Sequence, residues 1–184
     1  MIGDDFPAVL AAAQGGSEDA FAALWRDGHP ALLRYLRVSA ADAAEDVAGE
    51  IWVQVVRGLA GFRGDEQAWR AWLFTIARRR ALDERRRRAR HPVAPLMDMP
   101  RHLEPRTPDA AGQALDNLAS EEALAAVAAL PPHQAEVILL RVVAGLDTET
   151  VARIVGRSPG AVRVAAHRGL RRLAQIITMT GVTP

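Results

Sequence analysis

From Ser17 to Leu36 the apolar side chains recur every three or four positions, which is the spacing of an amphipathic helix. Ser17 is suited to cap the start of this helix, and Glu18 and Asp19 place acidic charge in its first turn. The apolar face consists of Phe21, Leu24, Trp25, Leu32, Tyr35 and Leu36. The run Gly28-His29-Pro30 predicts a kink or a short break within the helix.

A second helix is predicted from about Ala41, where apolar residues return in pairs every three to four positions. The pairs are Ala43/Ala44, Val47/Ala48, Ile51/Trp52 and Val55/Val56, followed by Leu59. Polar residues fall off this stripe and form what we call the acidic face: Asp42, Glu45, Asp46, Glu50 and Gln54. The pattern predicts a core side and an exposed side, and solubility alone explains an exposed acidic face.

A third helix is predicted after the loop 61–65, with Trp69, Trp72, Leu73 and Ile76 at helical spacing. It continues into the arginine block, which consists of Arg78–Arg80, Arg85–Arg88 and Arg90. Four consecutive arginines cover most of the circumference of a helix, so this end is predicted to be exposed. Such a block binds phosphates or is simply solvated, and taken alone the second reading is the commoner one.

The helical periodicity stops between His91 and Ala119, where five prolines follow one another closely. They are Pro92, Pro95, Pro100, Pro105 and Pro108. Because proline removes a backbone donor and restrains the residue before it, this stretch is predicted to be a flexible linker. The chain is therefore predicted to be all-α, with one small helical domain over 1–90, a linker over 91–119 and a second helical domain over 120–184.

The second domain begins with Ser120 as a helix cap, and Leu124, Val127 and Leu130 form the apolar stripe of its first helix. The pair Pro131-Pro132 suits the start of the next helix. That helix carries Ala135, Ile138, Leu139, Val142 and Val143 on its apolar side. Two further helices are predicted, over 147–155 and from Ser158-Pro159 onward, with Gly156-Arg157 between them. This order is typical of a helix-turn-helix.

The last helix has two unequal sides. Its inward stripe is Val162, Ala166, Leu170 and Leu173, and its other side carries Arg163, Val164, His167, Arg168, Arg171 and Arg172. A helix whose first half is cationic, held by a short preceding helix, suits entry into a DNA major groove. The alternative is a solvated arginine face on an ordinary bundle, and this feature alone does not decide between the two.

Composition narrows the function classes. The 184 residues include 23 basic side chains, all of them arginine, and the net charge of +1 says nothing about nucleic acid. With no cysteine, disulfides and thiolate metal sites are excluded. The five histidines show no metal-ligand spacing and no phosphate loop is visible, so no cofactor and no enzymatic activity is predicted. The start of the chain lacks a signal-peptide pattern and no apolar run is long enough to insert into a membrane, which favours a cytoplasmic protein.

Two sets of stretches occur in order along the chain. The first domain contains 21–25, 32–36, 44–50, 62–65, 72–78 and 81–83, and the second contains 130–137, 145–146, 160–163 and 167–168. The first set resembles region 2, and the second set region 4, of the extracytoplasmic-function (ECF) subgroup of the sigma-70 family of bacterial RNA polymerase sigma factors. The resemblance covers both domains and brackets a variable linker, which makes it more specific than either the helix-turn-helix or the arginine block alone.

The resemblance implies roles for particular residues. The surface that binds core RNA polymerase would include Asp46, Glu50, Ile51 and Gln54. The minus-ten promoter element would be bound by Phe62, Arg63, Gly64, Asp65, Trp69, Arg78 and Arg79. The minus-thirty-five element would be bound by Arg157, Ser158, Arg163, Val164, His167, Arg168 and Arg171. The Trp residues sit at core spacing, so Phe62 in the loop is the better candidate for an aromatic that stacks on unpaired bases.

The family also implies partners: core RNA polymerase, through the clamp helices and flap of its large subunits, promoter DNA, and an anti-sigma protein that covers both domains. Three departures from the family pattern stand out. Gly49 replaces a common Gln beside the polymerase contact, and Arg79 replaces a common Asn at the minus-ten contact. Ala161 and Val164 replace small polar residues in the last helix, which leaves Arg163 and Arg168 as the specificity contacts.

These features together predict a non-catalytic sigma factor that directs core polymerase to promoters, supports DNA melting and starts transcription. Two rival hypotheses remain open at this point. An autonomous helix-turn-helix regulator would bind duplex DNA specifically without polymerase. A nucleic-acid-processing enzyme or adaptor that uses the arginine block would show metal- or nucleotide-dependent activity.

Overall fold

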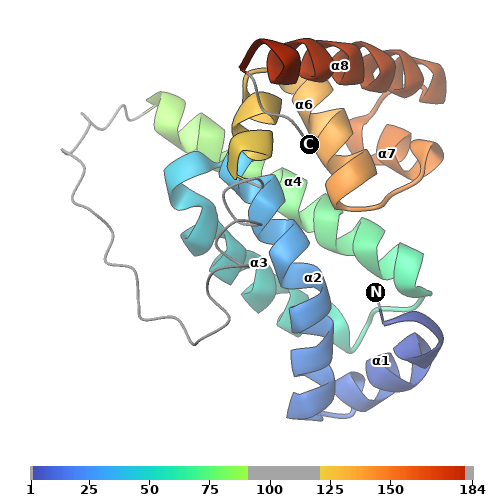
Figure 1. The fold of residues 1–184 in the computed structure, drawn as a ribbon. Helices are drawn as coiled ribbons and strands as arrows, with labels where there is room; N and C mark the ends of the chain where they lie inside the picture. Colours follow the sequence, from blue (N-terminus) through green and yellow to red (C-terminus); the bar gives the residue numbers. More distant parts are fainter. Residues whose placement is uncertain (1, 91–120, 181–184) are drawn as a thin grey trace, which may run out of the picture.

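The computed structural model describes residues 2–90 and 121–180, with side chains described as far as Thr178. All regular structure in these two ranges is helical, which confirms the predicted all-α class (Figure 1). The predicted linker over 91–119 lies outside the described residues.

The helices have the following bounds. The first domain contains a 3-10 turn η1 (Gly3–Asp5), α1 (Phe6–Gln14), α2 (Glu18–Ser39), a 3-10 turn η2 (Ala41–Ala43), α3 (Ala44–Leu59) and α4 (Glu66–Arg90). The second contains a helix over 121–128, α6 (Pro132–Ile138), the π-helical turn η3 (Leu139–Val143), α7 (Thr148–Val155) and α8 (Pro159–Thr180).

In the first domain α2, α3 and α4 pack on one another, and α1 packs on α2. The predicted stripes supply the centre of the core, where Leu24, Leu32, Ile51 and Leu73 are essentially inaccessible to solvent. Helix α1 was not predicted. Pro7 in its first turn and the Gly15-Gly16 pair after its end are the sequence signals that mark its bounds.

The short break predicted at Gly28-His29-Pro30 is wrong, because α2 runs without interruption from Glu18 to Ser39 with Pro30 inside it. The kink that was the alternative at this position stays a prediction. Close packing between helices explains why a glycine stands at position 28. A Cβ at Gly28 would lie 3.0 Å from Leu73 Cδ2 and 3.5 Å from the Trp52 ring, so a bare backbone lets α2 approach α4 and α3 closely.

Four residues predicted for the core are exposed: Trp25, Val56, Val142 and Leu170. Val56 and Leu170 lie at the edges of their stripes. Val55 is fully buried while Val56, one step around the helix, is 54% exposed. On α8 the neighbour Gly169 makes the close contact instead of Leu170, since a Cβ there would lie 2.6 Å from Ile138 Cδ1.

The second domain forms the predicted helix-turn-helix. Asp147 caps α7 by accepting a hydrogen bond from the Thr150 backbone N–H at 2.7 Å. Gly156, at φ +67°, ends α7 in the left-handed conformation, and the Ser158 hydroxyl accepts from Ala161 N–H at 3.2 Å to start α8. Helix α8 crosses α6 and α7 and lies along one edge of the molecule (Figure 1).

The two domains touch each other. Helix α2 packs on η3, and α4 packs on α7. The contact includes an ion pair in which Arg78 Nε on α4 donates to Glu136 Oε1 on α6 at 2.8 Å.

Candidate nucleic-acid and protein interfaces

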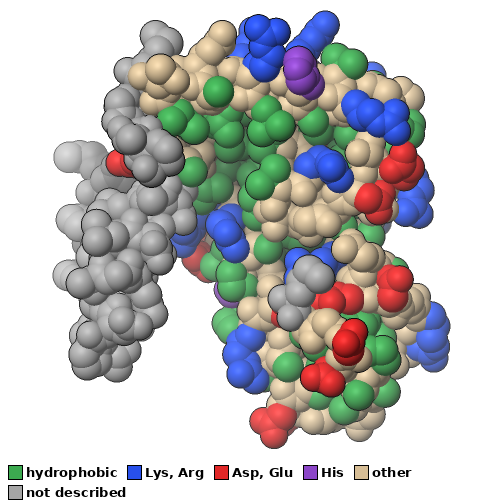
Figure 2. Space-filling view, turned by 45° about the vertical axis from the view of Figure 1, so that its right-hand side comes forward, with side chains coloured by type: hydrophobic (Ala, Val, Ile, Leu, Met, Phe, Trp, Pro, Cys, Tyr) green, Lys and Arg blue, Asp and Glu red, His purple; other side chains and the backbone are tan. Residues whose placement is uncertain are grey.

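The residues predicted to read duplex DNA occupy the exposed side of α8 and the turn before it. Arg163, Val164, His167, Arg168 and Arg171 are all exposed, and Val162 and Gly169 face the opposite way into the domain. Arg157 and Ser158 are exposed just before the helix. Figure 2 shows blue arginine side chains over α8 at the top of the molecule. The helix therefore presents a cationic side of the kind that enters a major groove.

The arginines of α8 differ in their surroundings. Arg163 Nη2 forms an ion pair with Glu149 Oε1 of α7 at 3.2 Å, and both side chains are about two-thirds exposed. Arg168, Arg171 and Arg172 have no polar partner within the part of the chain that the structure describes. They line a hollow of about 370 Å³ together with Gln134 and Gln175. These three guanidinium groups are available to an anion such as a DNA phosphate.

The loop before α4 is held in shape by contacts with α4 and α1. The Phe62 ring stacks on Trp72 at a centroid distance of 5.2 Å and packs edge-on against Trp69 at 5.6 Å. Gln14 of α1 donates from Nε2 to the carbonyl oxygens of Leu59 and Phe62, each at 2.9 Å. Phe62 is half-buried, so part of its ring remains accessible to a stacking base.

Gly64 and Asp65 have structural roles in this loop. A Cβ at Gly64, whose φ is +154°, would lie 2.7 Å from Ala68 Cβ, so only glycine fits. Asp65 Oδ1 accepts from Ala68 N–H at 2.8 Å and caps the start of α4. Arg63 is exposed, and its Nη1 donates to the carbonyl oxygen of Ala60 at 2.8 Å.

Trp69 is not a surface residue. It is 1% exposed and packs against Phe6, Phe62 and Trp72, so the prediction that it contacts minus-ten DNA is wrong. A ring at this depth can contribute to DNA binding only by supporting Phe62. The core spacing of the tryptophans had already pointed to this packing role.

Arg78 and Arg79 follow one another on α4 but lie in different surroundings. Arg78 is engaged by Glu136 of the second domain, with both side chains 25% exposed. Arg79 is exposed and lines a groove of about 620 Å³ between α3 and α4.

Much of the arginine block is neutralised by nearby carboxylates. Glu84, with a 7% exposed side chain, pairs with Arg87 and with Arg88 Nε at 2.9 Å. Burial raises the pKa of Glu84, but the hydrogen bonds from Arg88 and Arg87 and the positive charges of these two residues together outweigh burial, so the pKa is lowered overall and Glu84 stays ionised. Arg88 also reaches Asp42 of η2 at 3.4 Å. The block is therefore partly a structural network rather than a free cationic tail.

Of the four residues predicted to contact polymerase, α3 presents three to solvent and buries the fourth. Asp46 and Glu50 are exposed, and Gln54 is half-exposed. Ile51 is 0% exposed, so the prediction that it lies on the binding surface is wrong. It follows Glu50 by about 100° around the helix, which turns it into the core.

Arg80 ties the acidic side chains of α3 to α4. Its Nε donates to Gln54 Oε1 at 3.2 Å, and its Nη1 lies 3.4 Å from Glu50 Oε2. The same groove includes Val53, which is 51% exposed, and Arg57. Neither was predicted as a site residue, although Val53 lies three positions after Glu50 and off the apolar stripe, which is a signal for surface exposure.

Comparison with known proteins identifies the family. The model of sigma-70 region 2 matches residues 18–91, and that of sigma-70 region 4 matches residues 120–173. The ECF RNA polymerase sigma factor ShbA of Streptomyces griseus is 37% identical over 158 residues, which cover 79% of this chain and 81% of ShbA. The chain belongs to the ECF group of sigma-70 RNA polymerase sigma factors. This sigma factor therefore has a role in transcription initiation with core RNA polymerase.

Other similarities agree with this assignment. The sigma factor SigD of Mycobacterium tuberculosis is 31% identical over 188 residues, covering 98% of this sigma factor and 88% of SigD. Among solved structures, CnrH in complex with the cytosolic domain of CnrY has a similar fold, with a TM-score of 0.64, 22% identity and coverage of 96% and 99% of the two chains. RpoE in complex with NepR from Bartonella quintana has a TM-score of 0.63 at 22% identity and covers 86% of this chain and 96% of RpoE.

Within the described residues, no helix is both long and apolar enough to cross a membrane. Over the same residues, no group of three or more His, Asp or Glu side chains is arranged to hold a metal ion.

Proposed function

We propose that this sigma factor directs core RNA polymerase to promoters by reading two DNA elements, one with each domain, and that it stabilises the unpaired minus-ten bases during melting. The observation that carries the proposal is the exposed cationic side of α8, held by a capped helix-turn-helix. Arg163 and Arg168 flank Val164 on that side and are the proposed base-edge contacts in the minus-thirty-five element.

In the first domain, the proposed minus-ten contacts are the accessible part of Phe62, together with Arg63, Arg78 and Arg79. Gly64 and Asp65 would hold the loop that presents them. The proposed contact with the polymerase clamp is made by Asp46, Glu50 and Gln54, and we add Val53 as the apolar member of that surface because it is exposed between them. The flap of the polymerase would bind the second domain. The sigma factor acts without catalysing a reaction, in the cytoplasm where the polymerase works.

Run-off transcription with purified core polymerase on a pool of genomic promoters tests the proposal. Wild-type protein is expected to select start sites that share a common pair of upstream elements. Arg163→Ala and Arg168→Ala should each relax base preference in one of these elements, whereas Arg26→Ala, an exposed arginine on α2, should leave the selected promoters unchanged. If wild-type protein neither binds core polymerase nor selects start sites, the proposal is wrong.

The rival function, an autonomous regulator, predicts specific duplex binding by the protein alone. On the present proposal binding by the protein alone is weak, because two modest contacts gain from being held on one polymerase. Gel-shift titrations with and without core polymerase separate the two functions.

A further proposal concerns an anti-sigma protein as partner. It is supported by CnrH and RpoE, which share the fold and whose structures contain CnrY and NepR respectively. Co-purification from native cells grown without an inducing signal should recover a stoichiometric partner. Recovery of the sigma factor alone under all such conditions would contradict it.

A further inference from the structure

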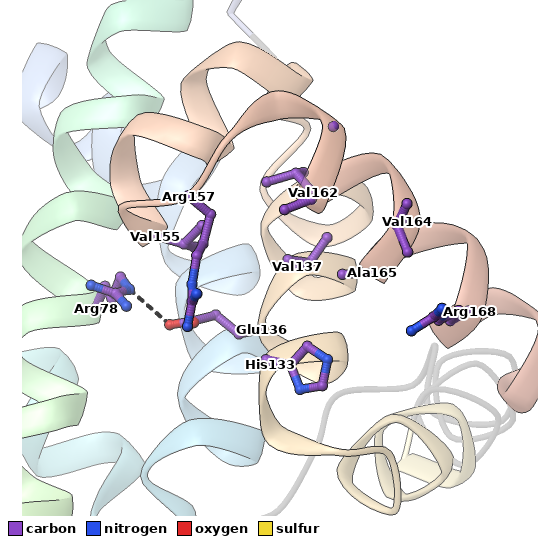
Figure 3. A pocket seen from close by; sticks show the side chains of 12 residues that line it. Arg78, His133, Glu136, Val137, Val155, Arg157, Val162, Val164, Ala165 and Arg168 are labelled. Carbon is purple, nitrogen blue, oxygen red and sulfur yellow. Dashed lines mark hydrogen bonds and ion pairs between the residues drawn. The ribbon is translucent and has the colours of Figure 1, made fainter.

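Glu136 lies in the cleft between the two domains. The cleft has a volume of about 600 Å³, and Arg78 of α4 lines it on one side while residues of α6, α7, the turn after α7 and α8 line the other. Its surface is apolar at Val137, Val155 and Val162 and charged at its ends (Figure 3). The Glu136 side chain is 25% exposed and points toward α4.

The charges that line this cleft are unbalanced. Three arginines line it, Arg78, Arg157 and Arg168, and Glu136 is the one carboxylate among its lining residues. Glu136 Oε1 accepts a hydrogen bond from Arg78 Nε at 2.8 Å. Figure 3 shows Arg157 pointing from the turn before α8 toward the same carboxylate. One acidic side chain therefore faces arginines from both proposed DNA-binding surfaces.

The Arg78–Glu136 pair, which joins the first domain to the second, is better protected from solvent than the Arg163–Glu149 pair within the second domain. Both of its side chains are 25% exposed, whereas Arg163 and Glu149 are 65% and 64% exposed. Solvent and salt screen a half-buried pair less than an exposed one. The pair is also reinforced by the packing of α2 on η3 and of α4 on α7.

The second domain also approaches the neighbouring part of α4, through Ile154 of α7. Arg78, Arg79 and Arg86 line a hollow of about 330 Å³ whose other wall includes Ile154 of α7. In this arrangement the helix-turn-helix lies against the side of α4 that carries the proposed minus-ten arginines.

We propose that Glu136 is an internal substitute for promoter DNA, which occupies Arg78 and keeps the two domains together until polymerase and DNA separate them. A carboxylate offers a guanidinium group the same negative charge and the same pair of acceptor oxygens as a phosphate. The inference rests on the proposed function, because it takes Arg78 to be a minus-ten contact. It assigns to Glu136 the control of that contact in the free protein.

The test uses the full-length protein in the absence of polymerase. Because the chain contains no cysteine, Ala12→Cys on α1 and Ala174→Cys on α8 provide two exposed positions for a fluorescent donor and acceptor. Glu136→Gln keeps the size of the side chain and removes its charge. We expect lower energy transfer in this variant, together with binding to a labelled single-stranded minus-ten oligonucleotide that is tighter on the order of fivefold.

Glu122→Gln is the matched control, since it makes the same charge change at an exposed position of the helix over 121–128. It should alter neither measurement. A salt titration of the wild type provides a second test that needs no substitution at Glu136, because added salt should lower energy transfer in the wild type more than in Glu136→Gln.

Unchanged energy transfer in a folded Glu136→Gln protein overturns the proposal, as does equal tightening of DNA binding by Glu122→Gln. Opening of the domains without tighter oligonucleotide binding also overturns it, because Glu136 would then join the domains without screening Arg78. Failure of the wild-type protein to select start sites in the run-off assay would instead contradict the proposed function. The energy-transfer result on domain opening would still stand.

Discussion

At the scale of single residues, Gly49 and Gly169 are helical glycines with opposite surroundings. A Cβ at Gly49 would meet nothing within 4 Å, whereas a Cβ at Gly169 would lie 2.6 Å from Ile138 Cδ1 and 3.3 Å from Gln134 Cβ. Gly49→Ala is therefore expected to raise the free energy of unfolding by about 1 kcal/mol through helix propensity. Gly169→Ala should lower it by about 1–3 kcal/mol through overpacking between α8 and α6. Urea unfolding of both variants would show whether the free energy of unfolding rises in Gly49→Ala and falls in Gly169→Ala.

His29 makes stability depend on pH. Its Nδ1 accepts a hydrogen bond from Trp52 Nε1 at 3.0 Å, so the ring is neutral there. Burial lowers the pKa of His29, and the charge of Glu45 opposes this only partly. Because the folded-state pKa is below the unfolded value of 6.5, this contribution to stability is complete above pH 6.5 and is lost as pH falls toward the folded pKa.

Unfolding at about pH 7 and about pH 5.5 would measure this effect. The wild type should lose more stability over this interval than His29→Gln, which has no titrating ring. Equal losses would show that other groups cause the pH dependence.

At the scale of elements, the start of α7 controls the stability of the helix-turn-helix. Asp147 accepts from the backbone N–H and the hydroxyl of Thr150 at 2.7 and 3.0 Å. Asp147→Ala should therefore destabilise α7 by about 1 kcal/mol. Asp147→Asn, which retains an acceptor oxygen, should cost less. Helix content and unfolding by circular dichroism would test this order.

Hydrogen bonds from Thr150 lower the pKa of Asp147, so its contribution is present above the ordinary value of 3.8 and is lost as pH falls below it. The difference between wild type and Asp147→Ala should shrink on acidification. A constant difference would mean that the charge of Asp147 does not contribute to capping.

Most helices were predictable from sequence because their apolar residues repeat with the helical period and their ends carry caps. The caps predicted at Ser17 and Ser158 are formed. Helix α1 was missed because its short run, rich in alanine, has little contrast between its two sides. Of the kink or short break predicted around Pro30, the break did not form, because local preference was outweighed by the packing of α2 along its whole length.

Exposure of single residues was harder to predict than the helices themselves. Consecutive residues lie about 100° apart around a helix, so one of two neighbours can be in the core while the other faces solvent. Glu50 and Ile51 show this on α3. The partners of charged residues depend on tertiary structure, so no sequence pattern indicated that Glu136 binds Arg78 or that Arg80 binds Gln54. The exposed cationic side of α8 was predictable, because the helical spacing of residues within α8 alone determines which of them share a side.

At the scale of the whole molecule, salt dependence should report how many arginines contact DNA. For the complex with core polymerase, Arg171→Gln is expected to weaken promoter binding for all sequences and to reduce the slope of log affinity against log salt by about 0.9. Arg153→Gln, an exposed arginine on α7 that donates to Thr150 Oγ1, is the control. A slope unchanged by Arg171→Gln would remove this residue from the proposed interface.

The side-chain amide of Gln14 links the amino-terminal helix to the loop that holds Phe62, 48 positions further along the chain. A chain shortened past this residue would retain all the proposed DNA-contacting residues yet lose the two hydrogen bonds that Gln14 Nε2 donates to the carbonyl oxygens of Leu59, at the end of α3, and Phe62, in the loop. On the proposed function, truncations that remove Gln14 should therefore slow strand separation while leaving duplex recognition by α8 intact. If the first domain stabilises unpaired bases as proposed, removal of α1 would impair promoter opening more than promoter recognition.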